Sequence, residues 1–339
     1  MQTQCKKCVM DKSAEEFKID SNGICNFCHQ AQKSLKEIQG LTLPVIKGKK
    51  YDCLLGLSGG VDSSYLLHEI VKRGLKPLCF SVDNGWNKPT SDENILKMVE
   101  KLKVPFYRYT IDLKKFTQLQ SAFMSAGQKN IEIPTDHILM ATSYELASKY
   151  GIKYILSGGN VATESIMPPS WGYNARDLVH IKDIFKKITG KKLKGLPTCS
   201  LFKFNYYQWL KGIRIIYPLD VWGYDRAKAI KILEYEYNWI DYGNKHEENI
   251  FTDWFQNFYL FEKFNIDKRK AHLSSMINSG QITREEGMRI LQQNPIFPYL
   301  GLEKDVMRYK KRPYTDFKTD ERLYSFISKV VRFLRKCSF

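Results

Sequence analysis

The apolar positions of this chain form short runs that are separated by segments with helical periodicity. Five runs rich in Ile, Leu, Val and aromatic residues have the length of buried strands, and they span residues 51–57, 75–82, 104–111, 153–156 and 213–217. Apolar side chains repeat at the spacing of one helix face in residues 92–102, 138–149 and 226–237. Because strands alternate with helices, the pattern predicts an α/β fold with a doubly wound parallel sheet.

Several residues mark the ends of these predicted helices. A helix is expected directly after the first strand, with Gly74 at the position of a C-cap glycine. Thr135 and Asp136 are predicted N-cap residues of the helix at 138–149, and Gly151 is predicted to end it.

A glycine-rich turn lies between the first strand and its helix. It reads Ser-Gly-Gly-Val-Asp-Ser-Ser at residues 58–64. Gly59 and Gly60 allow the backbone to close around an anion, and the helix N-terminus offers N–H groups and a positive dipole. The turn therefore predicts a phosphate site with added donors from the hydroxyls of Ser58, Ser63 and Ser64.

Asp62 is the unusual member of this turn. A carboxylate beside a phosphate repels it unless a divalent cation lies between them, so we predict that Asp62 is a Mg²⁺-associated and catalytic residue together with Ser58. The turn is not a Walker A loop, because no Gly-Lys-Ser/Thr follows the glycines. It resembles the SGGxDS pyrophosphate loop of the PP-loop ATPases, which cut ATP between the α and β phosphates and adenylate a substrate oxygen. The resemblance implies ATP binding by Ser58, Gly59, Gly60, Val61, Asp62, Ser63 and Ser64.

Two other predicted strands end in polar or flexible residues. Val82, Asp83 and Asn84 end the second strand, and Gly158, Gly159 and Asn160 follow the fourth, with Glu164 one helical turn later. Ligands gather at the carboxyl ends of parallel strands, so we predict nucleotide contacts at both turns and a second Mg²⁺ ligand in Glu164. The alternatives are a plain polar turn after the second strand and a helix start capped by Asn160 after the fourth.

Four cysteines near the N-terminus form two C-x-x-C pairs, Cys5/Cys8 and Cys25/Cys28. Two such knuckles supply the four thiolates of a closed, tetrahedral, structural zinc site. Disulfide exchange is the competing interpretation of C-x-x-C. The paired knuckles, with no helical pattern starting at either motif, favour Zn²⁺.

The chain is predicted to contain three regions. Residues 1–45 form the zinc-ribbon-like unit, residues 46–240 the nucleotide-binding domain and residues 241–339 a helical region. The second region carries an insertion at about 163–211, which we predict to be the acceptor lid because long loops above a parallel sheet are usually functional. This insertion is rich in aromatic and basic residues, among them Trp171, Tyr173, Arg176, Lys182 and Lys203.

The tail of the helical region has one apolar face. That face predicts docking on the protein's own surface, with an anionic membrane as the alternative. Its members are Leu323, Phe326, Ile327, Val330 and Leu334.

Composition adds an expectation about partners and location. Of the 339 residues 43% are hydrophobic, which is ample for a large core. The 53 Lys and Arg against 36 Asp and Glu give a net charge of +17 and predict an anionic partner. No apolar run approaches the length of a spanning helix and residues 1–5 lack a signal-peptide core, so we expect a cytoplasmic protein without a membrane span.

The other cysteines and one histidine carry weaker signals. Cys53 and Cys79 lie in predicted strands and are expected to be buried thiols. No Gly-x-Cys-x-Gly elbow frames Cys199 or Cys337, so no glutaminase nucleophile is predicted and any ammonia would come from another chain. His246 stands near carboxylates, where a solvated or capping role is favoured over a ligand or base.

Taken along its length, the sequence resembles the N-acetyl sugar amidotransferase family, bacterial enzymes of O-antigen and flagellin sugar synthesis that convert an acetamido group to an acetamidino group. The resemblance lies in the four cysteines, the loop at 58–64, the turn at 158–160 and the tracts at 267–275 and 280–286. The loop is shared across the PP-loop superfamily, whereas the late helical tracts are more particular to this family.

The resemblance implies a mechanism and partners. The acetamido oxygen of a nucleotide-activated sugar would take AMP from ATP, with Mg²⁺ near Asp62, and ammonia would then displace AMP from the imidate. In the family, ammonia comes from a glutaminase subunit that works with a cyclase-like subunit, both similar to imidazole glycerol phosphate synthase. Nucleic acid is not expected as a partner.

Two alternatives remain at this stage. A tRNA-modifying PP-loop enzyme would suit the zinc ribbon and the net charge of +17. Thiolating members of that class generally need a reactive cysteine near the loop, for which Cys199 is the one candidate. A non-catalytic zinc-and-helix scaffold is disfavoured by the intact Ser58 and Asp62.

Overall fold

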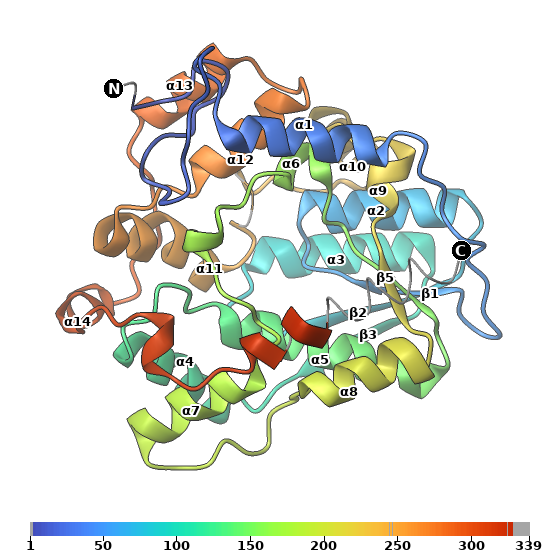
Figure 1. Ribbon diagram of the computed structural model, residues 1–339. Coiled ribbons are helices and arrows are strands. Elements are labelled where there is room, and N and C mark those ends of the chain that lie inside the picture. The colour runs from blue at the N-terminus through green and yellow to red at the C-terminus, as the bar shows by residue number, and fades with distance from the viewer. Residues whose placement is uncertain (1–2, 244, 246, 324, 328–339) are drawn as a thin grey trace.

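The computed structural model describes residues 3–243, 245, 247–323 and 325–327. Its centre is a five-stranded parallel sheet with the order β3-β2-β1-β4-β5 (Figure 1). The strands are β1 Cys53–Gly56, β2 Pro77–Asp83, β3 Phe106–Thr110, β4 Tyr154–Leu156 and β5 Arg214–Ile216. Each of the five predicted strands is present and is shorter than predicted, with β2 ending one residue later, at Asp83. The parallel α/β fold is confirmed.

Helices cover the sheet and extend beyond its edge. The first group is α1 Asn26–Ile38, α2 Val61–Lys72, α3 Pro89–Leu102, α4 Leu113–Ser125, α5 Ile133–Tyr150, α6 Val161–Glu164 and α7 Leu178–Thr189. The second is α8 Leu201–Asn205, α9 Pro218–Trp222, α10 Arg226–Tyr237, α11 Ile250–Trp254, α12 Arg269–Asn278, α13 Arg284–Gln292 and α14 Glu303–Arg308. Short 3₁₀ turns lie at η1 Pro169–Trp171 and η4 Tyr314–Asp316, and π-helical segments at η2 Tyr206–Leu210 and η3 Phe255–Lys263.

Alternate side chains of the central strand point to opposite faces of the sheet. Cys53 and Leu55 pack in one cluster with α2, α3 and α10, whereas Leu54 packs with α5 and α8. All three side chains are fully buried. A strand that is covered on both faces has apolar residues at successive positions. The apolar run at 53–57 is therefore typical of a central strand in a parallel sheet.

The start of α5 differs from its prediction. Thr135 and Asp136 are not N-cap residues, because the helix begins earlier, at Ile133, with Glu132 at the N-cap position. Pro134 explains the difference, since a proline is compatible with the first helical turn, where its missing N–H has no intrahelical partner. Asp136 therefore lies inside the first turn. The predicted end at Gly151, in the left-handed conformation, is confirmed.

The insertion at about 163–211 is folded rather than an open loop. Its helices α7 and α8 begin at capping side chains, since Asp177 accepts from the N–H of His180 and Ser200 accepts from that of Lys203. Thr163, Glu164 and Met167 are the insertion residues that line the cavities described below. The aromatic and basic residues that suggested a lid do not line them.

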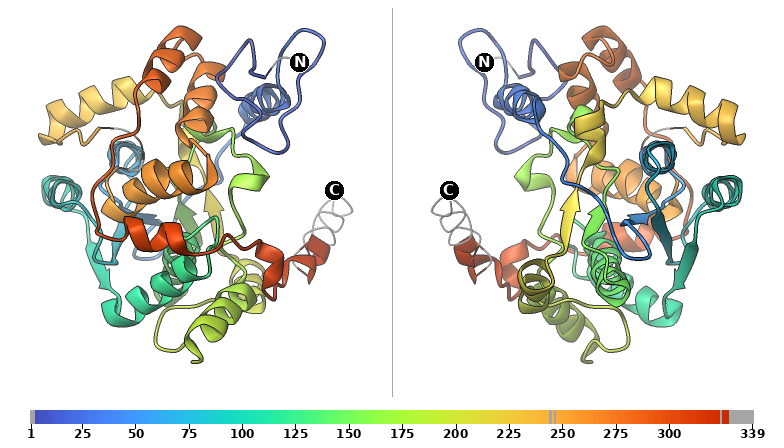
Figure 2. Two further views of the ribbon diagram at one scale, coloured as in Figure 1. Left: turned by 90° about the vertical axis from the view of Figure 1, so that its left-hand side faces the viewer. Right: turned by 90° about the vertical axis from the view of Figure 1, so that its right-hand side faces the viewer.

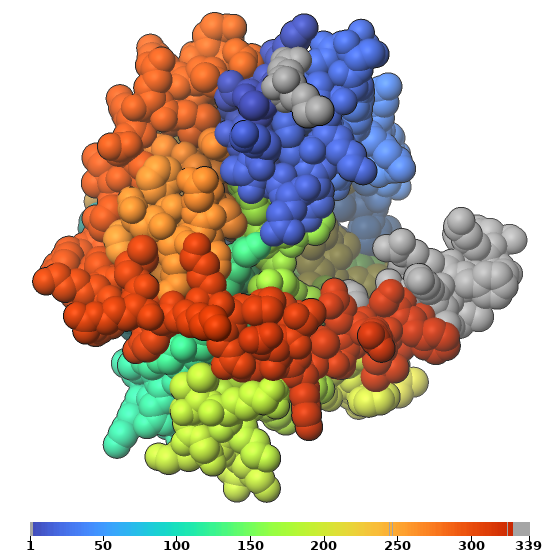
Figure 3. All heavy atoms as spheres, turned by 60° about the vertical axis from the view of Figure 1, so that its left-hand side comes forward, coloured from blue at the N-terminus to red at the C-terminus, as the bar shows by residue number. Residues whose placement is uncertain are grey.

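A further apolar cluster joins distant parts of the chain. It contains the four N-terminal cysteines, side chains of α4 and α7, and the aromatic residues of α11 and η3, with Trp254 and Tyr259 fully buried. Near the C-terminus, the Tyr314 hydroxyl donates to Asp177 at 2.6 Å. Figure 3 shows this C-terminal segment, in red, as a band between the orange helices and α7. The division of the chain at residues 45 and 240 stays a prediction.

Some expectations fall outside the described residues, namely those for His246, Cys337, Val330 and Leu334. Among the described helices, none combines the length and apolar character needed to cross a membrane.

Candidate active site

The glycine-rich turn closes tightly between β1 and α2. Gly59 has a φ of +80°, and a Cβ there would lie 2.3 Å from the carbonyl oxygen of Ser91, so only glycine fits. Gly60 is the N-cap residue and supplies no side-chain cap, and at the start of the 12-residue helix the Val61 N–H donates to the Tyr242 hydroxyl at 3.1 Å. The hydroxyls of Ser58 and Ser63 lie 3.3 Å apart and hold the turn together.

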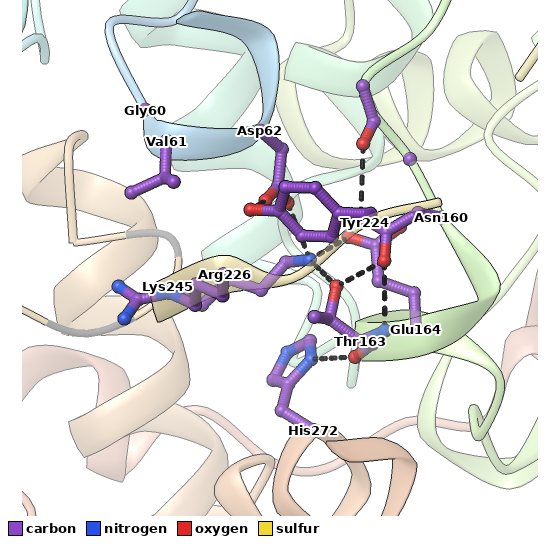
Figure 4. Close-up of polar contacts among 12 residues, drawn as sticks. Gly60, Val61, Asp62, Asn160, Thr163, Glu164, Tyr224, Arg226, Lys245 and His272 are labelled. Carbon is purple, nitrogen blue, oxygen red and sulfur yellow. Dashed lines mark hydrogen bonds and ion pairs between the residues drawn. The ribbon is translucent and has the colours of Figure 1, made fainter. Parts of the chain in front are cut away.

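Asp62 is paired with a cation of the protein itself. Its carboxylate accepts from the Lys245 ammonium at 2.8 Å and from the hydroxyl of Tyr224. The same ammonium lies 2.7 Å from a Glu164 oxygen and donates to the Thr163 hydroxyl at 2.7 Å. Figure 4 shows Lys245 reaching into this group of oxygens from a separate segment. The structure thus brings together Asp62 and Glu164, as predicted, around a lysine that the sequence analysis missed.

The electrostatics of this group follow from its burial. Burial alone lowers the pKa of Lys245, but Asp62 and Glu164 outweigh it, so the net pKa is raised. Burial alone would raise the pKa of Glu164, but the Lys245 charge outweighs this effect, so the net pKa of Glu164 is lowered. The pKa of Tyr224 is raised by burial and by the adjacent Asp62 charge. At physiological pH, Lys245 and Glu164 are therefore charged and Tyr224 is neutral.

The polar groups of the turn after β4 form hydrogen bonds with one another. The Asn160 side chain accepts from the Thr163 N–H at 2.9 Å and caps α6, which is the structural alternative that the sequence left open. A Cβ at Gly158 would lie 3.0 Å from the Asp62 carbonyl carbon and the Ser63 nitrogen, so this glycine lets the two turns touch. Nucleotide contacts by Gly158, Gly159 and Asn160 stay a prediction.

The end of β2 combines a polar turn with a cavity wall. Asp83 accepts from the Gly85 N–H at 3.0 Å, and Asn84 accepts from the Trp86 N–H at 3.1 Å. Val82 and Asn84 line a cavity, whereas Asp83 does not. An ATP contact through Asp83 therefore stays a prediction, and Asn84 is the polar side chain placed to face a ligand.

Two cavities meet at the carboxyl edge of the sheet. The first, of about 520 Å³, extends from Gly56, Leu57 and Ser58 to the start of α5 and to α11. The second, of about 690 Å³, lies between Lys245, α12 and the segment after α13. Three residues line both cavities, namely Gln256, Lys268 and His272.

Several residues of the first cavity were missed as site residues. Glu132 and Asp136 line it from α5, Lys268 and His272 from near the start of α12, and Glu248 from the loop before α11. Lys268 and His272 belong to the late tract that carried the family resemblance, so that tract was the signal for them. No local signal marks Lys245 or Glu132.

The donor set around Asp62 suits a cation. Mg²⁺ prefers oxygen ligands. Asp62, Glu164 and Thr163 supply such oxygens, and all three lie at hydrogen-bonding distance from the position of the Lys245 nitrogen. That position is held by the Lys245 ammonium, so a metal bound between the two carboxylates requires this lysine to move. Mg²⁺ binding stays a prediction.

The N-terminal cysteines form a cluster that can hold a metal ion. The sulfur atoms of Cys5, Cys8, Cys25 and Cys28 all lie within 4.8 Å of one another and are buried. The cluster packs on α12 and α13, because the Asn278 amide donates to the Cys28 sulfur at 3.3 Å and Arg284 donates to the Cys5 and Cys8 carbonyls. Four thiolates in this arrangement suit a closed zinc site. Figure 2 shows the N-terminal segment beside these helices from both sides.

The remaining described cysteines are buried. Burial raises the pKa of Cys79 to about 12 and that of Cys199 to about 12, and it raises the pKa of Cys53 further. The predicted burial of Cys53 and Cys79 is confirmed. Cys199 packs in the cluster with α5 and its N–H donates to His137. None of the cysteines that the structure describes lines either of the two cavities.

The fold and the site define a class of protein. A parallel sheet in the order β3-β2-β1-β4-β5, with an SGGxDS turn between the central strand and its helix, gives the chain a PP-loop ATPase-like architecture. A four-cysteine cluster precedes it and a helical region follows.

Comparison with known proteins finds a family match for the C-terminal part of the chain and a curated relative. Residues 248–331 match the family described as LPS biosynthesis protein WbpG-like, C-terminal domain. An uncharacterized protein of Methanocaldococcus jannaschii is 26% identical over 168 residues, which are 46% of this chain. The chain spans about 58% of the length of that curated relative.

Similar solved structures include a tRNA thiolase and an NAD synthetase. The U34-tRNA thiolase NcsA from Methanococcus maripaludis with its [4Fe-4S] cluster has 14% identity and a TM-score of 0.36, covering 94% of this chain and 99% of that one. The NH3-dependent NAD synthetase from Campylobacter jejuni has 19% identity and a TM-score of 0.28, covering 40% of this chain and 58% of that one.

Proposed function

We propose that this chain is an ATP-dependent amidotransferase. It converts the acetamido group of a nucleotide-activated sugar to an acetamidino group, through an adenylated imidate and ammonia, in bacterial surface polysaccharide or flagellin glycan synthesis. One observation carries the proposal. The segment that matches a lipopolysaccharide biosynthesis family supplies Glu248, Lys268 and His272 to the same cavity as Ser58 of the glycine-rich turn. The family-specific segment and the nucleotide loop thus face one space.

The residues have distinct roles in this reaction. An amide oxygen is a poor leaving group, so ATP first converts it to a phosphate ester, with pyrophosphate as the leaving group. The backbone of residues 58–64 and the N-terminus of α2 bind the pyrophosphate portion. Lys245 would offset the phosphate charge, and Asp62 and Glu164 are the residues that would hold Mg²⁺. When bound, Mg²⁺ supplies charge neutralisation on the phosphates.

Ammonia is the second substrate, and another protein provides it. The resemblance to the N-acetyl sugar amidotransferase family supports a glutaminase subunit and a cyclase-like subunit as partners. The described cysteines support this as well, because each is either in the four-cysteine cluster or buried in the core. ATP and nucleotide sugars are cytoplasmic compounds, and we place the reaction there.

The alternative of a tRNA-modifying enzyme has less support. The net charge of +17 suits RNA. Thiolating members of that class generally need a reactive cysteine near the loop, and the described lining of both cavities contains none.

A direct assay tests the proposal. The purified chain is incubated with ATP, MgCl₂, ammonium chloride and a panel of UDP-acetamido sugars. We expect AMP and amidine in equal amounts, with the sugar lighter by about one dalton because NH replaces oxygen. Glutamine in place of ammonium should give no product with this chain alone. ATP consumption that gives ADP, or AMP formation that requires tRNA and not a sugar, would refute the proposal.

A further inference from the structure

The first turn of α5 presents two carboxylates to the nucleotide cavity. Glu132 and Asp136 are four residues apart, so they lie on the same side of the helix start. Both line the cavity that Ser58 lines, and Lys268 faces them from just before α12. Nothing in the glycine-rich turn requires such a group, because a negative charge beside a nucleotide opposes its binding. Their presence indicates a chemical task other than phosphate binding.

The two carboxylates have different surroundings. Glu132 is 8% exposed; one oxygen accepts from the Thr252 hydroxyl at 3.0 Å, and the other, Oε1, is buried without a hydrogen-bond partner among the described residues. Asp136, by contrast, is exposed to the cavity. A buried carboxyl with an unpaired oxygen therefore lies one helical turn from an accessible carboxylate.

The charge states follow from these surroundings. Burial and the neighbouring Asp136 raise the pKa of Glu132 to about 8, so Glu132 is largely neutral at physiological pH. Asp136 is open to the cavity but is shielded from bulk water by the surrounding protein, which raises its pKa to about 6, and Lys268 limits that rise. Asp136 is thus ionised and more basic than an ordinary aspartate. Pairs of carboxyl groups held at different pKa values are typical of acid–base sites.

The proposed reaction needs a base at this place. When the acetamido oxygen attacks ATP, the adjacent N–H becomes strongly acidic, and a neutral imidate forms only if that proton leaves. We propose that Asp136 is the general base that takes the N–H proton of the acetamido group in this step. The assignment rests on the proposed function, and it places the acceptor's amide between Ser58 and α5.

The step balances as follows. The amide oxygen forms a bond to the α phosphorus, the bond to the β-phosphate oxygen breaks and pyrophosphate leaves. The N–H electron pair becomes the C=N bond and its proton passes to the Asp136 carboxylate. Asp136 returns this proton to the same nitrogen as ammonia adds to the carbon. The C–O bond then breaks, AMP leaves with the former acetamido oxygen, and one ammonia proton is lost to solvent, which leaves the amidinium product.

The Asp136→Asn variant tests the assignment. Asparagine keeps the shape of the side chain and cannot accept the proton. We expect kcat for AMP formation to fall by about 10²-fold or more, the typical contribution of a general base. The KM for the sugar and the Kd for ATP should stay within about threefold, since binding does not depend on the transferred proton.

A matched control removes a carboxylate from the same helix away from the cavity. Glu145 pairs with Lys203 at 2.6 Å and is partly exposed, so Glu145→Gln should keep full activity. If Asp136→Asn keeps wild-type kcat, or loses ATP affinity in parallel with kcat, the assignment is wrong although the proposed function stands. If the wild-type chain makes no AMP with any acetamido sugar, the proposed function fails and the assignment with it.

Discussion

At the residue scale, the site is organised around an ion pair that spans the chain. Asp62 and Lys245 are 183 residues apart in sequence, yet they meet at 2.8 Å. The spacing of the glycine-rich turn was enough to predict Asp62, because a strand, a turn and a helix are local features. It was not enough to predict Lys245, whose position depends on how the segment before α11 returns to the sheet. Asp136 was interpreted as a helix cap for a different reason, because α5 begins earlier, at Ile133.

The first prediction concerns Asp62 itself. Asp62→Ala removes a partner of Lys245 and Tyr224 and no core contact. We expect AMP formation to fall by about 10²-fold or more, with the unfolding midpoint changed by only a few degrees. Steady-state AMP release and thermal unfolding measure the two effects. Asp305→Ala, an exposed carboxylate on α14, is the control and should retain activity. Wild-type turnover by Asp62→Ala would exclude its assigned role.

The second prediction uses the raised pKa of Glu132. Its ordinary pKa is 4.5 and its folded-state pKa is about 8, so between these values the unfolded chain releases a proton that the folded protein retains. Below 4.5 both states hold the proton. The wild-type free energy of unfolding therefore falls, through this group, as pH rises from 4.5 to 8.

Glu132→Gln removes that cost because glutamine does not titrate. The variant should match the wild type near pH 4.5 and be more stable at pH 8, by on the order of a few kcal/mol. Urea unfolding of the ligand-free protein at both pH values measures it. Equal stability of the two proteins at the higher pH would show that Glu132 is not held in its neutral form.

At the element scale, the sequence predicted the strands of the sheet better than the starts of the helices. The central strand was identified by its continuous apolar run because it is buried on both faces, as Leu54 and Leu55 show. The edge strands β3 and β5 are only partly buried, and their apolar and aromatic content identified them. Element starts were harder, since Pro134 moved the start of α5. The insertion was predicted to be a lid from its length, and the capping roles of Asp177 and Ser200 show that it contains helices; the lid role stays a prediction.

The third prediction concerns the four-cysteine cluster as a structural element. We expect one tightly bound zinc per chain, because four buried thiolates form a closed tetrahedral site. Cys25→Ser should lose the zinc and lower the unfolding midpoint, since the knuckles pack on α12 and α13. Metal analysis after gel filtration measures the content. Cys53→Ala, which removes a thiol from the core of the sheet, should keep its zinc. Undiminished zinc in Cys25→Ser would contradict this assignment.

At the scale of the whole molecule, the fold places the late helical tract between the four-cysteine cluster and the cavity that Ser58 lines. Arg284 donates to the Cys5 and Cys8 carbonyls, and His272, one element earlier, lines both cavities. The resemblance identified this tract as family-specific, but periodicity carries no information about which surfaces a helix contacts. The net charge of +17 predicted an anionic ligand without locating it.

The central claim is that the acetamido oxygen is activated by AMP, and following that oxygen tests it most directly. A UDP-acetamido sugar labelled with heavy oxygen at the acetamido carbonyl is converted with ATP and ammonium, and the AMP is examined by mass spectrometry. We predict that essentially every AMP formed carries the label in its phosphate and that the amidine carries none. Unlabelled AMP alongside amidine would mean that water or ammonia cleaves ATP, and would contradict the account.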